Sequence, residues 1–160
     1  MGHCGGSGRQ AVFSGRFDHA IDEKGRVSIP ARFREALQRE GHERLFITNE
    51  IFHREKCLAL YPPAEWDTLI DKIKAKPSFD QNVQLFQAFF VGGAYEVQVD
   101  RQGRILIPNK LREFASLGRE ITYSAMHDRF QLWDRVVLGR VLKVTEEQIL
   151  DPHFFEKLNL

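Results

Sequence analysis

The sequence predicts a mainly β (α+β) fold: a β-barrel of pseudo-two-fold symmetry, built from two tandem units and flanked by helices. The first observation is a repeat, because AIDEKGRVSIPARFREAL, from residue 20, returns as QVDRQGRILIPNKLREFA from residue 98. The second is that later segments also match, ERLFIT with REITYS and CLALYP with RFQLWD. Four short strands and a short helix bury little by themselves, whereas two such units can interleave their strands into a closed barrel with few free edges.

Each copy opens with a predicted β-hairpin. In the first copy, two short runs rich in β-branched and aromatic residues within 17–29 indicate two strands. Between them, Asp22 can accept hydrogen bonds from backbone N–H groups two or three residues on, and Gly25 can adopt a positive φ without a Cβ clash. The second copy has Asp100 and Gly103 at the same places. We interpret these four residues as the ones that shape the two turns.

A short helix follows each hairpin. Pro30 suits the first position of a helix, where its missing N–H costs little. Phe33 and Leu37 lie four residues apart, on one face of the predicted helix. Two further strands, over 45–48 and 57–60, complete the first unit, and the second copy repeats this order.

Between the copies, two stretches have apolar residues at helical spacing. The first follows Pro62 and Pro63, and the second follows Ser78, a candidate N-cap. We interpret the phenylalanine-rich face of the second as packing on the barrel, with packing against another subunit as the alternative. A weaker helix is predicted over 134–142, where Gly139 interrupts the pattern. The apolar positions are Trp66, Leu69, Ile70 and Ile73 in the first stretch and Phe79, Val83, Phe86 and Phe90 in the second.

The predicted organisation has five parts. The last part ends in ILDPHFFEKLNL, which is apolar enough to dock on another surface. The parts are a flexible N-terminal tail over 1–12, a first unit over 13–63, connecting helices over 64–93, a second unit over 94–137, and a C-terminal helix and tail over 138–160.

Composition excludes several classes of protein. The chain has 160 residues, with 42% hydrophobic and 28% charged residues, which is ordinary for a globular protein. Its formal net charge is only +1, so a nucleic-acid partner has to be inferred from local clusters of cations. No apolar run approaches the ~20 residues that span a bilayer, and the start of the chain lacks the apolar core of a secretory signal. The two cysteines, Cys4 and Cys57, suggest no disulfide framework, and we expect a reduced, cytoplasmic compartment.

No pattern indicates catalysis, a metal or a cofactor. The six histidines are scattered, and only His53 and Cys57 stand four residues apart, which we interpret as a loop histidine and a buried cysteine. No nucleophile elbow, phosphate loop or dinucleotide motif occurs, and VGGAYE, from residue 91, is typical of a helix stop. We therefore expect no catalytic residue, no bound metal, no cofactor and no small-molecule substrate.

Cations gather around the repeated turns. Arg26 and Arg104 follow the two glycines, and one interpretation is that each pairs with the aspartate of its own turn. A surface ion pair contributes only ~0–1 kcal/mol, so stability does not require arginine twice. If the copies are related by a two-fold axis, both clusters lie on one face, where they can contact DNA phosphates and, through arginine, guanine in the major groove. The candidate DNA-binding residues are Lys24, Arg26, Arg32 and Arg34 in the first copy, and Arg101, Arg104, Lys110 and Arg112 in the second.

The repeated D-x-x-G-R-[VI]-x-I-P, followed by [KR]-[FL]-R-E, resembles the swapped-hairpin barrel of the AbrB/SpoVT-like DNA-binding superfamily. Two copies separated by LYPPAEWDTLIDKI and a Phe/Gln-rich helix resemble the MraZ family of transcriptional regulators, over residues 13–142. The resemblance implies a bacterial cytoplasmic protein of the nucleoid that forms ring-like homo-oligomers. It implies binding to short, G-rich repeats in the promoter of the division and cell-wall gene cluster, which includes its own gene, and repression of that cluster. The DNA-contacting motif falls on 22–26 and 100–104.

A non-catalytic scaffold is the alternative function. Such a protein would assemble through its phenylalanine-rich helices and apolar tail and would leave the basic face unused. A DNA-binding regulator should show sequence preference in the presence of competitor DNA and a steep dependence of affinity on salt.

Overall fold

The computed structural model describes residues 12–41 and 43–160, so the predicted flexible tail lies almost entirely outside the described residues. The first copy contains β1 (Arg16–Ala20), β2 (Arg26–Ser28), α1 (Ala31–Arg39), β3 (Arg44–Phe52) and β4 (Glu55–Tyr61). The connection contains α2 (Pro63–Lys74), α3 (Gln81–Phe86) and the π-helix η1 (Gln87–Val91). The second copy contains β5 (Tyr95–Gln98), β6 (Arg104–Leu106), α4 (Asn109–Phe114), β7 (Glu120–Met126) and β8 (Arg129–Asp134), and α5 (Arg135–Ile149) and α6 (Phe154–Leu158) follow.

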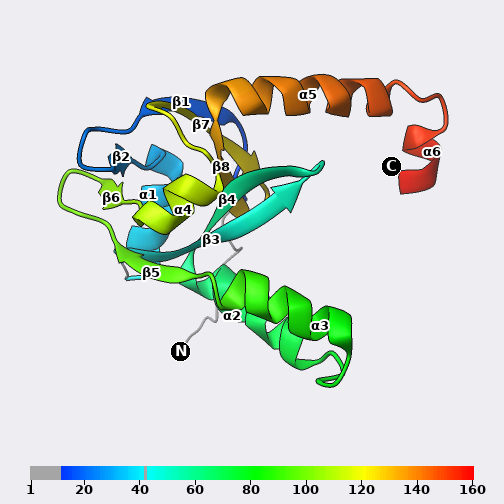
Figure 1. Ribbon diagram of the computed structural model, residues 1–160, viewed down its shortest axis with the longest axis horizontal. Helices are drawn as coiled ribbons and strands as arrows, with labels where there is room; N and C mark the ends of the chain where they lie inside the picture. Colours follow the sequence, from blue (N-terminus) through cyan, green and yellow to red (C-terminus); the bar gives the residue numbers. More distant parts are fainter. Residues whose placement is uncertain (1–11, 42) are drawn as a thin grey trace, which may run out of the picture.

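The two copies exchange their first strands. β1 pairs with β7 of the second copy, and β5 pairs with β3 of the first, at the two edges of an antiparallel sheet ordered β1-β7-β8-β4-β3-β5. β2 and β6 form a separate two-stranded ribbon (Figure 1). The structure thus confirms the predicted mainly β fold with flanking helices. The limits drawn for the units, 13–63 and 94–137, stay a prediction, because the strands of both copies belong to one sheet.

The β2–β6 ribbon lies on the pseudo-two-fold axis. Val27 pairs with Ile105, which holds the same place in the other copy. The backbone N–H of Ile29 donates to the Gly103 carbonyl at 3.0 Å, and the counterpart bond, from the isoleucine of the second copy to the turn glycine of the first, has the same length. Each turn is therefore anchored to the ribbon strand of the other copy, which holds both turns at one end of the molecule.

One hydrophobic core serves both copies. Phe33 of α1 is fully buried, and its ring lies 5.4 Å from those of Phe13 and Phe130. Leu111 holds the corresponding position in α4 and is also buried. Burial of each such side chain contributes about 1.5–3 kcal/mol. Further fully buried members are Val27, Leu45, Ile47, Leu58 and Leu60 from the first copy, and Ile121, Tyr123 and Leu132 from the second.

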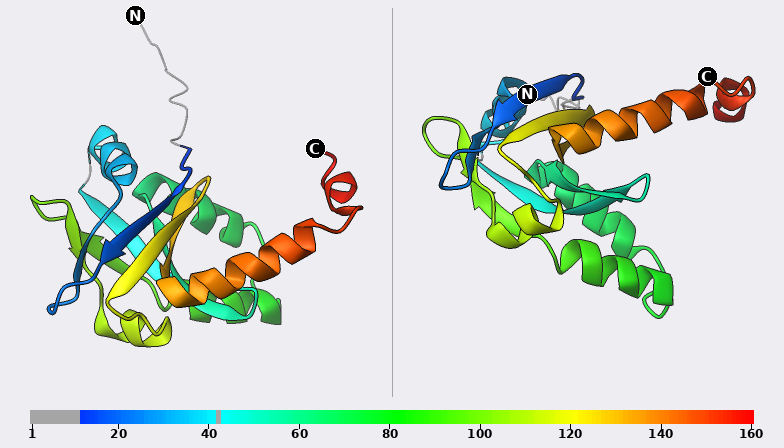
Figure 2. Two further views of the ribbon diagram at one scale, coloured as in Figure 1. Left: turned by 90° about the horizontal axis from the view of Figure 1, so that it is seen from above. Right: turned by 45° about the horizontal axis from the view of Figure 1, so that its top comes forward.

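The helices between the copies form an arm, here called the α2–α3 arm, that leaves the barrel (Figures 1 and 2). At its base, the Trp66 ring stacks on Phe46 with 4.9 Å between centroids and on Phe90 with 5.4 Å. Phe86 extends the stack at 4.9 Å from Phe90, and is itself exposed. Only part of the phenylalanine-rich face therefore packs on the barrel.

The start of α3 differs from the prediction. Asp80 is the N-cap in place of Ser78, since its carboxylate accepts hydrogen bonds from two backbone N–H groups of the first turn. Phe79, which the spacing placed in the helix, precedes it and is 94% exposed. The π-helix η1 has a wider turn than an α-helix, because Gly92 N–H donates to the Gln87 carbonyl at 2.9 Å. This turn further shifts the phenylalanine-rich face away from 3.6-residue spacing.

The last long helix extends further than the predicted 134–142, because α5 continues to Ile149. Gly139 does not end it: the glycine lies on an open face, where its cost of ~1 kcal/mol is tolerated. Leu138 and Val141 are buried against the barrel, and the remainder of α5 leads with α6 away from it as the C-terminal arm (Figure 2). None of the helices in the described ranges combines the length and the apolar character needed to cross a membrane.

Candidate nucleic-acid interface

The two turns have the same backbone geometry. Asp22 Oδ1 accepts hydrogen bonds from the backbone N–H groups of Lys24 and Arg26, both at 2.9 Å. Asp100 Oδ1 does the same for the corresponding residues of the second turn, at 2.9 and 3.0 Å. In both turns the N–H of the arginine is the main cause that lowers the pKa of the aspartate below its usual value. Gly25 has a φ of 86°, in the left-handed region that favours glycine.

Arg26 and Arg104 are each held by the aspartate of their own turn. Arg26 Nε donates to Asp22 Oδ2 at 2.7 Å, and Arg104 Nε donates to Asp100 Oδ2 at 3.1 Å. The cross-turn ion pair, which the sequence left as one interpretation, therefore forms in both copies. It uses only the Nε edge, and among the described residues the terminal Nη groups of both arginines make no hydrogen bond. The aspartate thus orients each guanidinium and leaves its outer donors available.

Arg34 and Arg112 contact the turn of the opposite copy. Arg34 Nη2 donates to the Arg101 carbonyl at 2.9 Å, and a Cβ built on Gly103 would lie 3.0 Å from Arg34 Nη1. A Cβ on Gly25 would lie 2.8 Å from Arg112 Cζ. These glycines therefore serve close packing as well as a positive φ. Each helix arginine holds the other copy's turn in place, and both remain half-buried at the surface.

The other four candidate DNA-binding residues are exposed. Two lie on the turns and two are the second residues of α1 and α4, and none of their side chains forms an ion pair with a residue that the structure describes. The turns project from one end of the molecule, with α1 and α4 on either side (Figures 1 and 2). We call this end the ribbon face. Its exposed cations are Lys24, Arg32, Arg101 and Lys110.

A further cation at the ribbon face, Arg119, was not predicted from the sequence. Arg119 is exposed and precedes β7, and its carbonyl accepts a hydrogen bond from Ile21 N–H at 2.8 Å, directly before the first turn. The match of ERLFIT with REITYS contained the signal, since it aligns Arg119 with Glu43, a residue of opposite charge.

His53 and Cys57 do not form a site. Cys57 is buried, with Sγ 3.7 Å from Glu50 Oε2, and burial raises the pKa of its thiol. The His53 ring packs edge-on against Phe52 at 4.5 Å, in the β3–β4 turn. The described part of the chain contains no group of three or more His, Cys, Asp or Glu side chains arranged to hold a metal ion.

Comparison with known proteins gives a consistent result. Residues 12–89 and 90–146 each match a family described as "MraZ protein, putative antitoxin-like". Relatives from Carboxydothermus hydrogenoformans, Acetivibrio thermocellus and Desulforamulus reducens are each 40% identical over 124 residues, which is 78% of this chain and 82% of the relative. All three are named "Transcriptional regulator MraZ". A solution structure of a Pyrococcus horikoshii protein covers 74% of this chain and 95% of its own at 16% identity, but its TM-score of 0.34 adds nothing to the fold described above.

Proposed function

The chain belongs to the MraZ family of transcriptional regulators, and from this premise we propose that it binds double-stranded promoter DNA through its ribbon face. Its function is regulatory and not enzymatic. The observation that carries the proposal is the pair of arginines on the two turns, each fixed at Nε by an aspartate and, among residues 12–41 and 43–160, without a hydrogen bond at either Nη atom.

Arg26 and Arg104 are suited to reading bases. A two-stranded ribbon fits the major groove, and an arginine there can give two hydrogen bonds to guanine O6 and N7. Because Asp22 and Asp100 already orient the guanidiniums, little side-chain entropy is lost when these bonds form. The two arginines are also close in the ribbon, where Arg26 pairs with Leu106 and Arg104 with Ser28.

The surrounding cations are suited to phosphate contacts. The exposed Lys24, Arg32, Arg101 and Lys110 lie on both sides of the two turns, where they can position the ribbon on the DNA backbone. Arg34 and Arg112 support the turns from behind, and each keeps part of its guanidinium at the surface. We therefore assign base recognition to the two turn arginines, and sequence-independent affinity for DNA to the surrounding cations.

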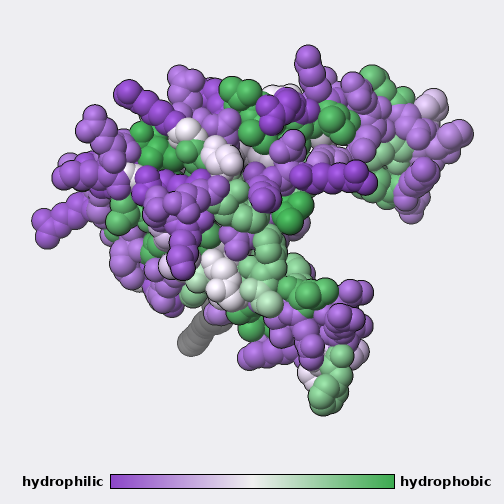
Figure 3. Space-filling model, viewed as in Figure 1, coloured by the Kyte–Doolittle hydropathy of each residue, from purple (hydrophilic) through white to green (hydrophobic). Residues whose placement is uncertain are grey.

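Assembly into a homo-oligomeric ring is the second part of the proposal. Exposed apolar side chains occur on both arms, and Figure 3 shows hydrophobic residues on the C-terminal arm as well as over the barrel. Several ribbon faces in one particle make each later contact intramolecular, which raises avidity by about 10²–10⁴ where spacing matches. The natural target is therefore a promoter with short repeated boxes. The exposed apolar residues on the arms include Phe79, Leu85, Phe86 and Val91, and Val144, Ile149, Leu150, Phe155 and Leu158.

The finer biological role follows from the family resemblance. We propose that the protein acts in the cytoplasm at the nucleoid, and that it represses the division and cell-wall gene cluster that includes its own gene. A footprint of the purified protein upstream of its own gene should show protection at repeated, G-rich boxes. Uniform protection without repeats would contradict the proposed target.

The direct test reverses the charge of both turn arginines. In gel-shift assays with promoter fragments, R26E combined with R104E should abolish the specific shift and leave the circular dichroism spectrum and particle size unchanged. Arg54, exposed in the β3–β4 turn, supplies the matched control, and R54E should bind as the unmodified protein does. Unchanged binding by the double variant would refute the proposed site. No DNA binding by the unmodified protein would favour the scaffold alternative, which the apolar arms alone could serve.

A further inference from the structure

Four side chains of the β2–β6 ribbon point away from the core. Val27 and Ile105, the central residues of the two strands, are buried, and side chains alternate between the two faces of a strand. The residues before and after them therefore share the outer face of the ribbon. This outer set is Arg26 and Ser28 from β2, and Arg104 and Leu106 from β6.

Leu106 is the apolar residue of that set. It is 56% exposed, although Ile105 and Ile107 on either side are buried in the core. Ser28 holds the equivalent position in the first copy. The fold therefore accepts a polar residue at this position, and core packing does not account for the leucine.

Leu106 and Ser28 each lie beside a turn arginine. Leu106 is directly opposite Arg26 in the antiparallel ribbon. Ser28 is likewise opposite Arg104. Directly opposite side chains lie on one face with Cβ atoms about 4.5–5.5 Å apart, so they can contact neighbouring groups of one ligand. The ribbon thus carries two unequal pairs, an arginine with a leucine and an arginine with a serine.

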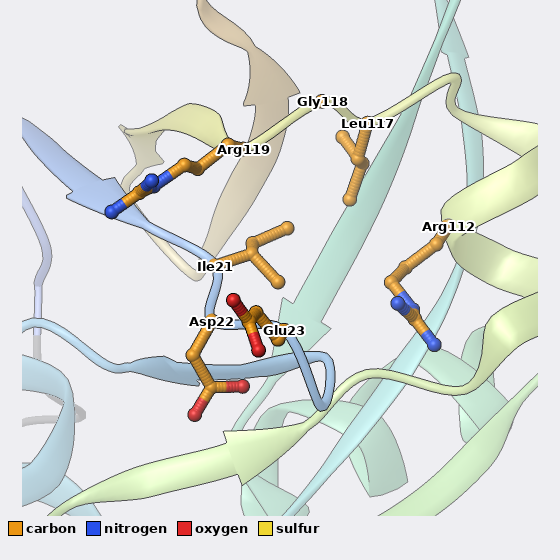
Figure 4. A pocket seen from close by; sticks show the side chains of 7 residues that line it. All are labelled: Ile21, Asp22, Glu23, Arg112, Leu117, Gly118 and Arg119. Carbon is orange, nitrogen blue, oxygen red and sulfur yellow. The ribbon is translucent and has the colours of Figure 1, made fainter.

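Leu106 borders open space together with cations. A surface hollow of about 630 Å³ is lined, among others, by Leu106, by Lys24 of the first turn and by Arg112 of α4. Figure 4 shows Arg112 extending from α4 toward the first turn. A polyanion bound by these cations would also cover the leucine. Leu106 therefore belongs to the same surface as the candidate DNA-contacting residues.

We propose that Leu106 contacts the C5-methyl group of a thymine beside the guanine that Arg26 reads. The inference rests on the proposed function of the ribbon face and deepens it. The methyl group is the apolar feature that distinguishes thymine in the major groove, and an apolar side chain is the partner that it takes. Arg104 has a serine beside it, which can hydrogen-bond to several bases and has no preference for a methyl group.

The two ends of the ribbon consequently differ in the bases that they prefer. The pair with the leucine favours guanine next to thymine, whereas the pair with the serine favours guanine without a fixed neighbour. A box bound in this way is not palindromic, although the two copies are related by a pseudo-two-fold axis. Leu106 therefore also fixes the direction in which one subunit lies on its box.

Removal of single methyl groups from the DNA tests the contact. Each thymine of a bound box is replaced in turn by deoxyuridine, which lacks the C5-methyl group and keeps the base pairing. With the wild-type protein, one replacement beside a guanine should weaken binding by a factor of about 4, the value for one methyl group withdrawn from water. With L106S, which gives the second copy the residue of the first, that replacement should change nothing. I51S, at a residue of β3 that is 55% exposed, is the matched control and should keep the wild-type sensitivity.

The thymine contact and the proposed function fail in different ways. Specific binding with no thymine that responds to deoxyuridine, or an equal response in L106S, would overturn the contact and leave the proposed function standing. Absence of binding to every promoter fragment would refute the proposed function, and the contact with it.

Selection of binding sites from a randomised duplex gives a second measurement. The wild-type protein should select thymine at one end of each box, and L106S should lose this preference. S28L should select thymine at both ends, because each turn arginine then has a leucine beside it. Unchanged selected sequences in both variants would overturn the proposal, even where their affinities differ from that of the wild type.

Discussion

The two turns of the ribbon face have the same backbone conformation but carry different charges. Asp22 and Asp100 make equivalent hydrogen bonds, Gly25 and Gly103 have φ values of 86° and 78°, and the arginine after each glycine is held at Nε. The residues that build the turn are thus the same in both copies. The residues that face outward are different: Glu23 and Lys24 in one turn, Arg101 and Gln102 in the other. The comparison indicates that folding requires the matching positions, while the differing ones adapt each turn to its own contact.

The largest expected effect tests whether the copies are one folding unit. Phe33→Ala should lower the free energy of unfolding by about 3–5 kcal/mol, and Leu111→Ala, at the equivalent position, by about 2–5 kcal/mol, because both side chains fill the shared core. Urea unfolding followed by circular dichroism and by tryptophan fluorescence should show a single coincident transition in both variants. Two separate transitions would mean that the copies fold independently, contrary to the exchanged strands.

The turn glycines should give the next largest effect, larger in the first copy. Gly25→Ala and Gly103→Ala each force an alanine into the left-handed region, which costs about 1–2 kcal/mol. The added Cβ would also displace an arginine, at 2.8 Å in the first turn and 3.0 Å in the second. Urea denaturation and gel shifts should show loss of stability and of DNA binding in both.

The matched control is Gly139→Ala, where a Cβ meets nothing within 4 Å and φ is not positive. It should stabilise α5 by ~1 kcal/mol and leave DNA binding unchanged. Loss of DNA binding in this variant as well would show that the loss in Gly25→Ala and Gly103→Ala is not specific to the turns.

These glycines also show how much the sequence could predict. The repeat indicated the barrel, the hairpins and the turn residues, because a D-x-x-G-R phrase has few local conformations. The sequence could not show that Arg34 and Arg112 lie against the opposite turn, since that contact depends on how α1 and α4 pack across the two-fold axis. The sequence alone did not assign Arg119 to the ribbon face, because the charge of Arg119 gains its meaning only from its place beside the first turn.

The misplaced helix ends have local causes. Ser78 was a reasonable cap, but Asp80 lies two residues closer to the helix and its charge favours the N-terminal end. Gly139 suggested an interruption of α5, yet tertiary contacts of Leu138 and Val141 hold the helix where the glycine stands. Electrostatics therefore set the start of α3, and tertiary packing set the extent of α5.

A smaller effect should follow if the second turn is given the first turn's surroundings. Glu43→Arg removes the partner of Arg34 and places two arginines beside the second turn, as Arg112 and Arg119 stand beside the first. The salt slope of DNA binding should steepen by about 0.9 for each subunit on the DNA. Glu43→Gln, which removes the acid without adding a base, should change the slope less, and an equal effect of both would argue against an added phosphate contact.

The smallest effect concerns pH. Folding lowers the pKa of both Asp22 and Asp100, mainly through the backbone N–H of the turn arginine. The stabilisation is therefore present above the ordinary pKa of aspartate, and it is lost as the pH falls through the lower value of the folded state. Asp22→Asn and Asp100→Asn should flatten the acid side of the stability–pH curve. The effect should be seen for both aspartates, and a stability–pH curve of either variant that is identical to that of the wild type would contradict it.

The most direct test of the account asks whether both turns reach the same DNA. A photoreactive residue placed at position 24 or at position 102, on the tips of the two turns, should crosslink to a promoter fragment, with the same residue at position 54 as the control. We expect crosslinks from both turn positions at neighbouring nucleotides of one box and none from position 54. Crosslinking from neither turn, or equally from all three positions, would contradict a ribbon face that binds DNA.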